Sequence, residues 1–142
     1  MSHIKIADGV AEVDASLYWD EPAKTIWRGR SESLSDESDV QVAKMARWAM
    51  TIQARSGPVA IVGLGVGVLP RLLANKDLTI YEKEQSVTDL FVAANPLLRA
   101  NFLGEWTGRF DRKYGAIAID HGYEFDEAAV REFLLPDGII LS

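Results

Sequence analysis

The sequence predicts an α/β domain with a mainly parallel sheet and flanking helices, and three observations favour this fold. An apolar, β-branched run at residues 59–63 enters a glycine-rich turn and is followed directly by an amphipathic segment. Short apolar runs then alternate with helical patterns to the end of the chain. Acidic residues follow several of these runs directly. Such alternation is typical of strand–helix–strand units, whose helices cover both faces of a parallel sheet.

The core elements can be placed from these patterns. The predicted strands are residues 59–63, 78–82, 98–103, 114–120 and 139–142, of which 98–103 is the weakest and could instead be helical. The predicted helices are residues 66–75, 86–94 and 126–133, and residues 134–138 form a turn before the last strand.

The first 57 residues have a different pattern. Residues 10–30 favour a β-hairpin with a polar turn at 20–23, and residues 31–38 are polar and turn-like. In residues 39–54, apolar side chains recur every three or four positions, as on one face of a helix. We therefore expect a single domain over 1–142, with a hairpin-and-helix extension (1–57) before a Rossmann-like core (58–142).

Composition excludes several classes of protein. Lys and Arg number 15 against 21 Asp and Glu, a net charge of −6, which disfavours nucleic acid and anionic membranes as partners. The absence of cysteine excludes disulfides and thiolate metal sites, and two distant histidines predict no metal site. The amino terminus lacks the apolar core of a signal peptide, and no run is long enough to span a bilayer, so a cytoplasmic protein is expected.

The glycine-rich turn and the acid after the second predicted strand form the strongest candidate site. Gly63, Gly65 and Gly67 would expose backbone to a ligand at the carboxyl end of the strand. Glu82 could accept hydrogen bonds from ribose hydroxyls beside that turn. Simple alternatives are tight strand–helix packing for the glycines and a solvated turn for Glu82. A nicotinamide-binding turn fits less well, because Val68 stands where that pattern requires glycine or alanine.

The fourth predicted strand ends at Asp120, which is the candidate catalytic residue. The carboxyl edge of a parallel sheet is where ligands bind, so Asp120 could orient or deprotonate an acceptor, or it could cap the following turn.

In this arrangement residues 59–142 resemble the class I S-adenosylmethionine-dependent methyltransferase fold, and within it the spermidine-synthase-like branch. The three glycines match the family's cofactor loop, and Glu82 matches its ribose-binding acid. Glu105, after Gly104, is similar to the acid that approaches the adenine. The resemblance implies S-adenosylmethionine or a close analogue as cofactor. It also implies transfer of a methyl or aminopropyl group to a small-molecule acceptor.

The chain departs from that branch in two respects. The second acid expected three residues after Asp120 is absent, and the sixth and seventh strands of the fold are missing. Two other functions therefore remain open: a catalytically degenerate nucleoside-binding or assembly module, and an NAD-binding oxidoreductase fragment. The last strand would leave an apolar sheet edge, which we expect the hairpin or a second subunit in a homodimer to cover.

Overall fold

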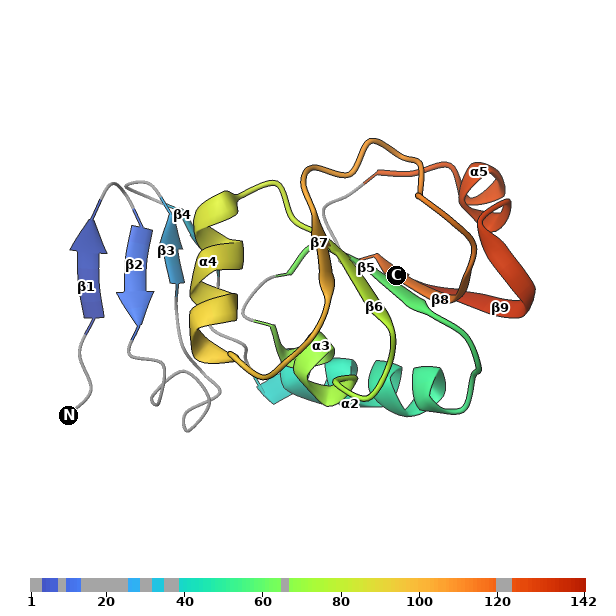
Figure 1. Cartoon of the computed structure of the whole chain (residues 1–142), viewed down its shortest axis with the longest axis horizontal. Coiled ribbons are helices and arrows are strands. Elements are labelled where there is room, and N and C mark those ends of the chain that lie inside the picture. Colours follow the sequence, from blue (N-terminus) through green and yellow to red (C-terminus); the bar gives the residue numbers. More distant parts are fainter. Residues whose placement is uncertain are drawn as a thin grey trace.

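The computed structural model describes residues 4–7, 10–13, 26–28, 32–34, 39–64, 67–119 and 124–142. The described strands form two separate sheets, one at each end of the molecule (Figure 1). The larger sheet has the order β7-β6-β5-β8-β9, and every neighbouring pair in it is parallel. The α/β fold class is thus confirmed.

The strands of the larger sheet follow the predicted order along the chain. They are β5 (Val59–Val62), β6 (Leu78–Tyr81), β7 (Asn101–Leu103), β8 (Tyr114–Ile119) and β9 (Leu134–Leu141). The weakly patterned region 98–103 contains β7, which pairs with β6 from Thr79↔Asn101 to Tyr81↔Leu103, so its strand assignment is confirmed.

β9 begins earlier than predicted. Leu134 pairs with Tyr114, but the next pair is Ala116↔Ile139, so residues 135–138 bulge out of the ladder. Asp137 has a φ of 64° in this bulge. The predicted turn at 134–138 therefore lies inside the strand, with Leu134 paired before the bulge and residues 139–141 paired after it.

Four helices are described: α2 (Asp39–Gln53), α3 (Val68–Leu72), α4 (Gln85–Ala94) and α5 (Glu127–Arg131). α3 is shorter than the predicted helix over 66–75. Leu73, the residue after α3, has non-helical backbone angles, and the amide of Lys76 closes a turn on the Leu73 carbonyl at 2.9 Å. No helix in the described ranges is long and apolar enough to cross a membrane.

The smaller sheet is an antiparallel meander in the order β1-β2-β3-β4. Its strands are β1 (Ile4–Ala7), β2 (Val10–Val13), β3 (Ile26–Arg28) and β4 (Glu32–Leu34). The predicted pairing within residues 10–30 is confirmed by the contact of β2 with β3 through Val10↔Arg28. β1 and β4 were not predicted, and β4 occupies part of the segment 31–38 that the sequence indicated as a turn.

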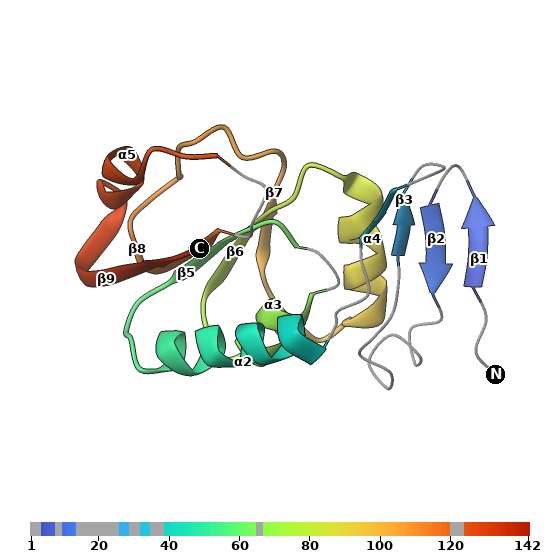
Figure 2. The same cartoon turned by 180° about the vertical axis from the view of Figure 1, so that it is seen from behind.

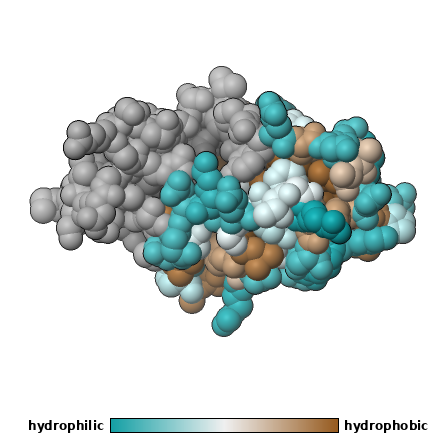
Figure 3. Space-filling view, turned by 90° about the horizontal axis from the view of Figure 1, so that it is seen from above, coloured by the Kyte–Doolittle hydropathy of each residue, from teal (hydrophilic) through white to brown (hydrophobic). Residues whose placement is uncertain are grey.

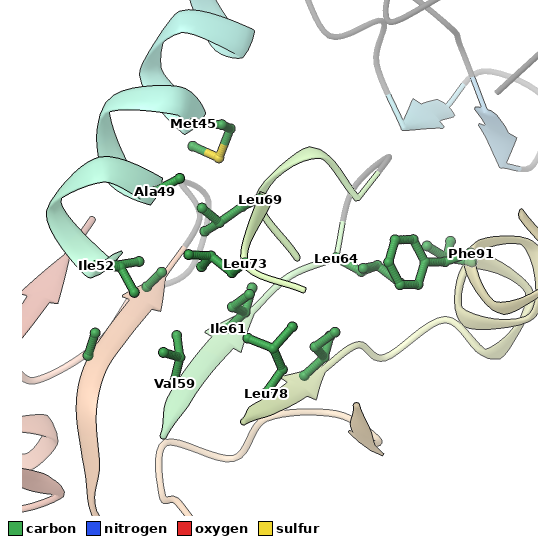
Figure 4. Packing of buried hydrophobic residues seen from close by; sticks show 14 residues of the cluster. Met45, Ala49, Ile52, Val59, Ile61, Leu64, Leu69, Leu73, Leu78 and Phe91 are labelled. Atoms are coloured by element: carbon green, nitrogen blue, oxygen red, sulfur yellow. The ribbon is translucent and has the colours of Figure 1, made fainter. Parts of the chain in front are cut away.

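The parallel sheet is covered on both faces. β5 places Val59 and Ile61 on the face that packs against α2, α3 and α4, and Ala60 and Val62 on the opposite face. β8 places Ala116 and Ala118 on the first face and bulky Ile117 and Ile119 on the other. Small side chains on the first face leave room for α2, whose Met45, Ala49 and Ile52 point toward the α3 leucines (Figure 4).

A loop and α5 cover the opposite face. Phe110, in the loop between β7 and β8, lies at the centre of an aromatic cluster. Its ring centroid is 5.4–6.0 Å from those of Tyr81, Trp106, Tyr114 and Phe133. Aromatic rings at these distances stabilise a core beyond the area they bury. The loop between β7 and β8 thereby packs against this face of the sheet, where a helix would otherwise lie.

A polar network sits beside this cluster. The Tyr81 hydroxyl donates to Asp111 Oδ1 at 3.2 Å and accepts from the Asp111 amide at 3.2 Å, and the Tyr114 hydroxyl also donates to Asp111 Oδ1. Desolvation would raise the pKa of Asp111, but the hydrogen bonds from Tyr114, the backbone and Tyr81, together with Arg112, outweigh it and lower that pKa. Burial, the largest cause, raises the pKa of Tyr81 to about 12.

The raised pKa of Tyr81 predicts a loss of stability in alkali. The neutral phenol is favoured in the folded state, so its contribution is complete below pH 10, the usual pKa of tyrosine, and is lost as the pH rises to about 12. A two-unit shift corresponds to at most about 3 kcal/mol, and solvent screening reduces it. Urea unfolding at pH 9 and pH 11.5 should show a smaller alkaline loss for Tyr81→Phe than for wild type. Equal losses in the two proteins would contradict this assignment.

The expectation that the hairpin covers the last strand is wrong for the described strands. β9 is the edge of the parallel sheet, and the meander forms its own sheet at the opposite end, beside α4 (Figures 1 and 2). Pairing of β9 with a second subunit stays a prediction.

Candidate functional site

The Glu82 carboxylate lies at the carboxyl ends of β5 and β6 and is buried, with 6% of the residue exposed. Its Oε1 accepts a hydrogen bond from the Leu64 amide at 3.1 Å, and its Oε2 accepts one from the Glu84 amide at 2.8 Å. The acid after the second core strand therefore contacts the glycine turn after the first. Because each carboxylate oxygen has a second acceptor site, both can also accept from a ligand hydroxyl.

The glycine turn begins directly after β5. The Gly63 amide donates to the Tyr81 carbonyl at 2.8 Å, which ties the turn to the end of β6. Gly67 closes the turn by donating to the Leu64 carbonyl at 3.0 Å, and it precedes α3 with a φ of 84°. Leu64 packs against the ring of Phe91 from α4 (Figure 4). The turn is held between two strands and two helices.

Position 67 requires glycine for a second reason besides its positive φ. A Cβ at this position would lie 2.3 Å from Cε1 of Phe91, which is fully buried. Two of the predicted glycines, Gly63 and Gly67, thus have left-handed backbone. Gly65 lies outside the described residues.

Gly67→Ala should lower the free energy of unfolding by about 2 kcal/mol more than Gly108→Ala. Gly108 has a similar φ of 94°, but a Cβ there would meet nothing within 4 Å, so it isolates the cost of φ alone. Urea unfolding of both variants measures the difference. If the two variants lose the same stability, Phe91 does not restrict the turn.

A pocket opens on the other side of the turn, between the sheet and α2. Its cavity volume is about 20 Å³, roughly the space of one water molecule. We call it the α2 pocket. Its lining residues come from α2, β5, the glycine turn, α3 and β8; they are Met45, Trp48, Ile61, Val62, Gly63, Leu64, Val68, Leu69, Pro70 and Ala118.

The other predicted site residues are only partly placed. Glu105 is exposed and follows β7, whose Leu103 carbonyl accepts from the Glu82 amide at 3.2 Å, so the two acids follow neighbouring strand ends. Asp120 lies outside the described residues, directly after β8. The structure brings Gly63, Gly67 and Glu82 together at one edge of the sheet.

The α2 pocket was not predicted from the sequence. The sequence indicated only that residues 39–54, which include Met45 and Trp48, form a helix with one apolar face. The available signal was Trp48 itself, because a tryptophan beside a core stripe often forms a pocket wall. Which strand end α2 would face depends on the tertiary fold, and the helical pattern does not specify it.

Comparison with known proteins identifies the fold. The chain is similar to the crystal structure of the glycopeptide N-methyltransferase MtfA, with a TM-score of 0.55 and 25% identity over 70% of this chain and 51% of that one. Coclaurine N-methyltransferase bound to N-methylheliamine and S-adenosylhomocysteine gives a TM-score of 0.57 at 18% identity, over 70% of this chain and 34% of the enzyme.

A third similar structure is an S-adenosylmethionine-dependent methyltransferase from Clostridium acetobutylicum, with a TM-score of 0.53 and 14% identity. The match covers 69% of this chain and 47% of that enzyme. No protein-family model and no curated protein sequence matches the chain. This chain spans about half the length, or less, of the enzymes compared.

These structures are class I S-adenosylmethionine-dependent methyltransferases, and MtfA has also been crystallised with S-adenosylmethionine. The strand order and the all-parallel pairing of the larger sheet agree with that likeness. The chain has the Rossmann-like fold of these methyltransferases.

Proposed function

We propose that this chain is the cofactor-binding core of a methyltransferase-like protein and that it binds S-adenosylmethionine or a close analogue. The observation that carries the proposal is the contact between the buried Glu82 carboxylate and the Leu64 amide at 3.1 Å. It brings a candidate ribose-binding acid and the glycine turn to one place, which is what an adenosine group needs.

The residues present fit such a ligand. Glu82 has spare acceptor capacity for the ribose hydroxyls, and Gly63 and Gly67 give the turn a positive φ at two positions. Glu105, at the next strand end, is the candidate for the adenine amino group. When bound, S-adenosylmethionine supplies an electrophilic methyl carbon, and the acceptor gains that methyl group and loses a proton.

Transfer to a small-molecule or glycopeptide acceptor agrees with the likeness to coclaurine N-methyltransferase and to the glycopeptide N-methyltransferase MtfA. We retain a positioning or proton-accepting role for Asp120 as a prediction. Aminopropyl transfer, the spermidine-synthase-like branch and a homodimer also stay predictions.

Thermal unfolding with added ligands tests the proposal. A ligand that binds only the folded state at 100 times its Kd stabilises it by about 2.7 kcal/mol. S-adenosylhomocysteine should therefore raise the Tm by several degrees, whereas NAD should not. A rise with NAD alone would favour an oxidoreductase fragment. A rise with S-adenosylhomocysteine but no methyl transfer to amine or hydroxyl acceptors would favour a catalytically degenerate binding module.

A further inference from the structure

The side chain of Phe91, on α4, packs against both described ends of the glycine turn. Phe91 is 1% exposed, and Leu64 lies against its ring (Figure 4). The ring also lies close to the backbone of Gly67, because a Cβ added there would be 2.3 Å from Cε1 of Phe91 and 2.4 Å from its Cδ1. The ring therefore contacts the turn at the residues before and after positions 65–66.

The same ring contacts β7. The ring centroids of Phe91 and Phe102 are 6.1 Å apart, in an edge-to-face arrangement. Phe102 precedes Leu103, whose carbonyl accepts a hydrogen bond from the Glu82 amide at 3.2 Å. Because β6 lies between β5 and β7 in the sheet, Phe91 contacts elements on both sides of the strand that Glu82 follows.

α4 thereby acts on both oxygens of the Glu82 carboxylate. Glu84 is the N-cap of α4, and its amide donates to Oε2 at 2.8 Å. Phe91 follows Glu84 by seven residues, which is about two helical turns and returns to the same face of the helix. The other oxygen, Oε1, accepts from the amide of Leu64, which packs on Phe91. One oxygen is thus held by α4 directly, and the other through the Phe91 ring and Leu64.

We propose that Phe91 is a positioning residue of the candidate cofactor site and that its ring holds Leu64 where the Leu64 amide meets Glu82. That the ligand held there is S-adenosylmethionine or an analogue rests on the proposed function. The backbone of Leu64 is restrained at both groups, since its carbonyl also accepts from the Gly67 amide at 3.0 Å. A turn that is ordered before the ligand arrives binds it more tightly, because binding then does not include the cost of ordering the turn.

Two phenylalanine-to-leucine variants test the proposal in the ligand-free protein. Phe91→Leu removes the ring that contacts the turn. Phe110→Leu is the matched control, because Phe110 is also a buried phenylalanine in contact with other rings, but on the opposite face of the sheet. We expect the amides of Leu64 and Gly67 to exchange hydrogen about tenfold faster in Phe91→Leu than in wild type, and within about twofold of wild type in Phe110→Leu. The Ile61 amide in β5 reports the overall loss of stability in both variants.

Ligand affinity is the second measurement. At a temperature at which both variants are folded by circular dichroism, Phe91→Leu should raise the Kd for S-adenosylhomocysteine about tenfold, because binding must then order the turn. Phe110→Leu should leave that Kd within about twofold of the wild-type value. A merely structural role for Phe91 would lower the Tm of both variants without this difference in Kd. Phe91→Met, which keeps more of the side-chain volume, replaces Phe91→Leu if the latter does not fold.

The two measurements separate this proposal from the proposed function. The proposal is overturned if Leu64 and Gly67 exchange at wild-type rates in a folded Phe91 variant, or equally fast in Phe91→Leu and Phe110→Leu. Faster exchange with an unchanged Kd would also overturn it, because the order of the turn would then not affect binding. If wild type binds no S-adenosylhomocysteine, the proposed function fails, but faster exchange confined to the Phe91 variant would still assign to this ring the ordering of the turn.

Discussion

Gly115→Ala is expected to lower the free energy of unfolding by about 4 kcal/mol, a large part of the 5–15 kcal/mol typical of a domain. Gly115 is the second residue of β8, and its amide donates to the Pro58 carbonyl at 2.8 Å. A Cβ there would lie 1.9 Å from the Ser56 carbonyl oxygen. Because the obstacle is backbone, relief requires β8 or the entry to β5 to move.

Gly104→Ala is the matched control for this substitution. Gly104 has no neighbour within 4 Å of an added Cβ and follows β7 on the surface, so its replacement should change stability by less than about 0.5 kcal/mol. Urea unfolding followed by circular dichroism measures both variants. A Gly115→Ala protein as stable as Gly104→Ala would show that β8 and the 56–58 segment do not approach as described.

Glu82→Gln is expected to weaken S-adenosylhomocysteine binding about 100-fold, because hydrogen bonds to a charged group contribute about 1.5–3 kcal/mol each. Each carboxylate oxygen accepts a hydrogen bond from a backbone amide, one from Leu64 and one from Glu84. A glutamine has one oxygen and an NH₂ group, so it would satisfy one amide and place a donor against the other. The variant therefore loses charge at the proposed ribose position and also loosens the glycine turn.

Isothermal titration calorimetry measures this loss, and Glu132→Gln is a charge-matched control. Glu132 is exposed and follows α5, on the opposite face of the sheet from the turn, so its neutralisation should leave the Kd unchanged. Equal affinities for wild type and a folded Glu82→Gln protein would show that Glu82 serves only to hold the turn.

The order of the core strands along the chain was predictable from the local sequence. Buried parallel strands are apolar on both faces, so the runs that contain β5, β6 and β8 were recognisable without any partner. Glu82 was predictable because it is an acid directly after such a run. Its hydrogen bond to Leu64 confirms that the two strand ends meet.

Other features depended on contacts distant in sequence. The pairing of Leu134 with Tyr114, which moves the predicted turn inside β9, is set by β8 and not by residues 134–138. Phe110 lies at the centre of the aromatic cluster, but the sequence around it has no helical or strand periodicity that would predict this position. β1 and β4 are short strands whose pattern is too brief to recognise.

Exposed apolar side chains are also hard to interpret from sequence. On the face shown in Figure 3, hydrophobic residues form separate patches between hydrophilic ones. The large exposed hydrophobic side chains among the described residues are Met50, Leu72, Val92 and Leu97. Met45 and Met50 are the same residue type on the same helix, yet one is buried and the other exposed, because the orientation of α2 in the fold turns only Met45 toward the sheet.

The most direct test of the central claim is the amide spectrum of the protein during titration with S-adenosylhomocysteine. The Leu64 and Glu84 amides donate to the Glu82 carboxylate, so any ligand that binds this carboxylate must change their environment. We predict that these two amides and that of Gly63 show the largest saturable shifts, and that Val130 in α5 shows none. Saturable binding that leaves Leu64 and Glu84 unshifted, or no binding at millimolar ligand, would contradict the account.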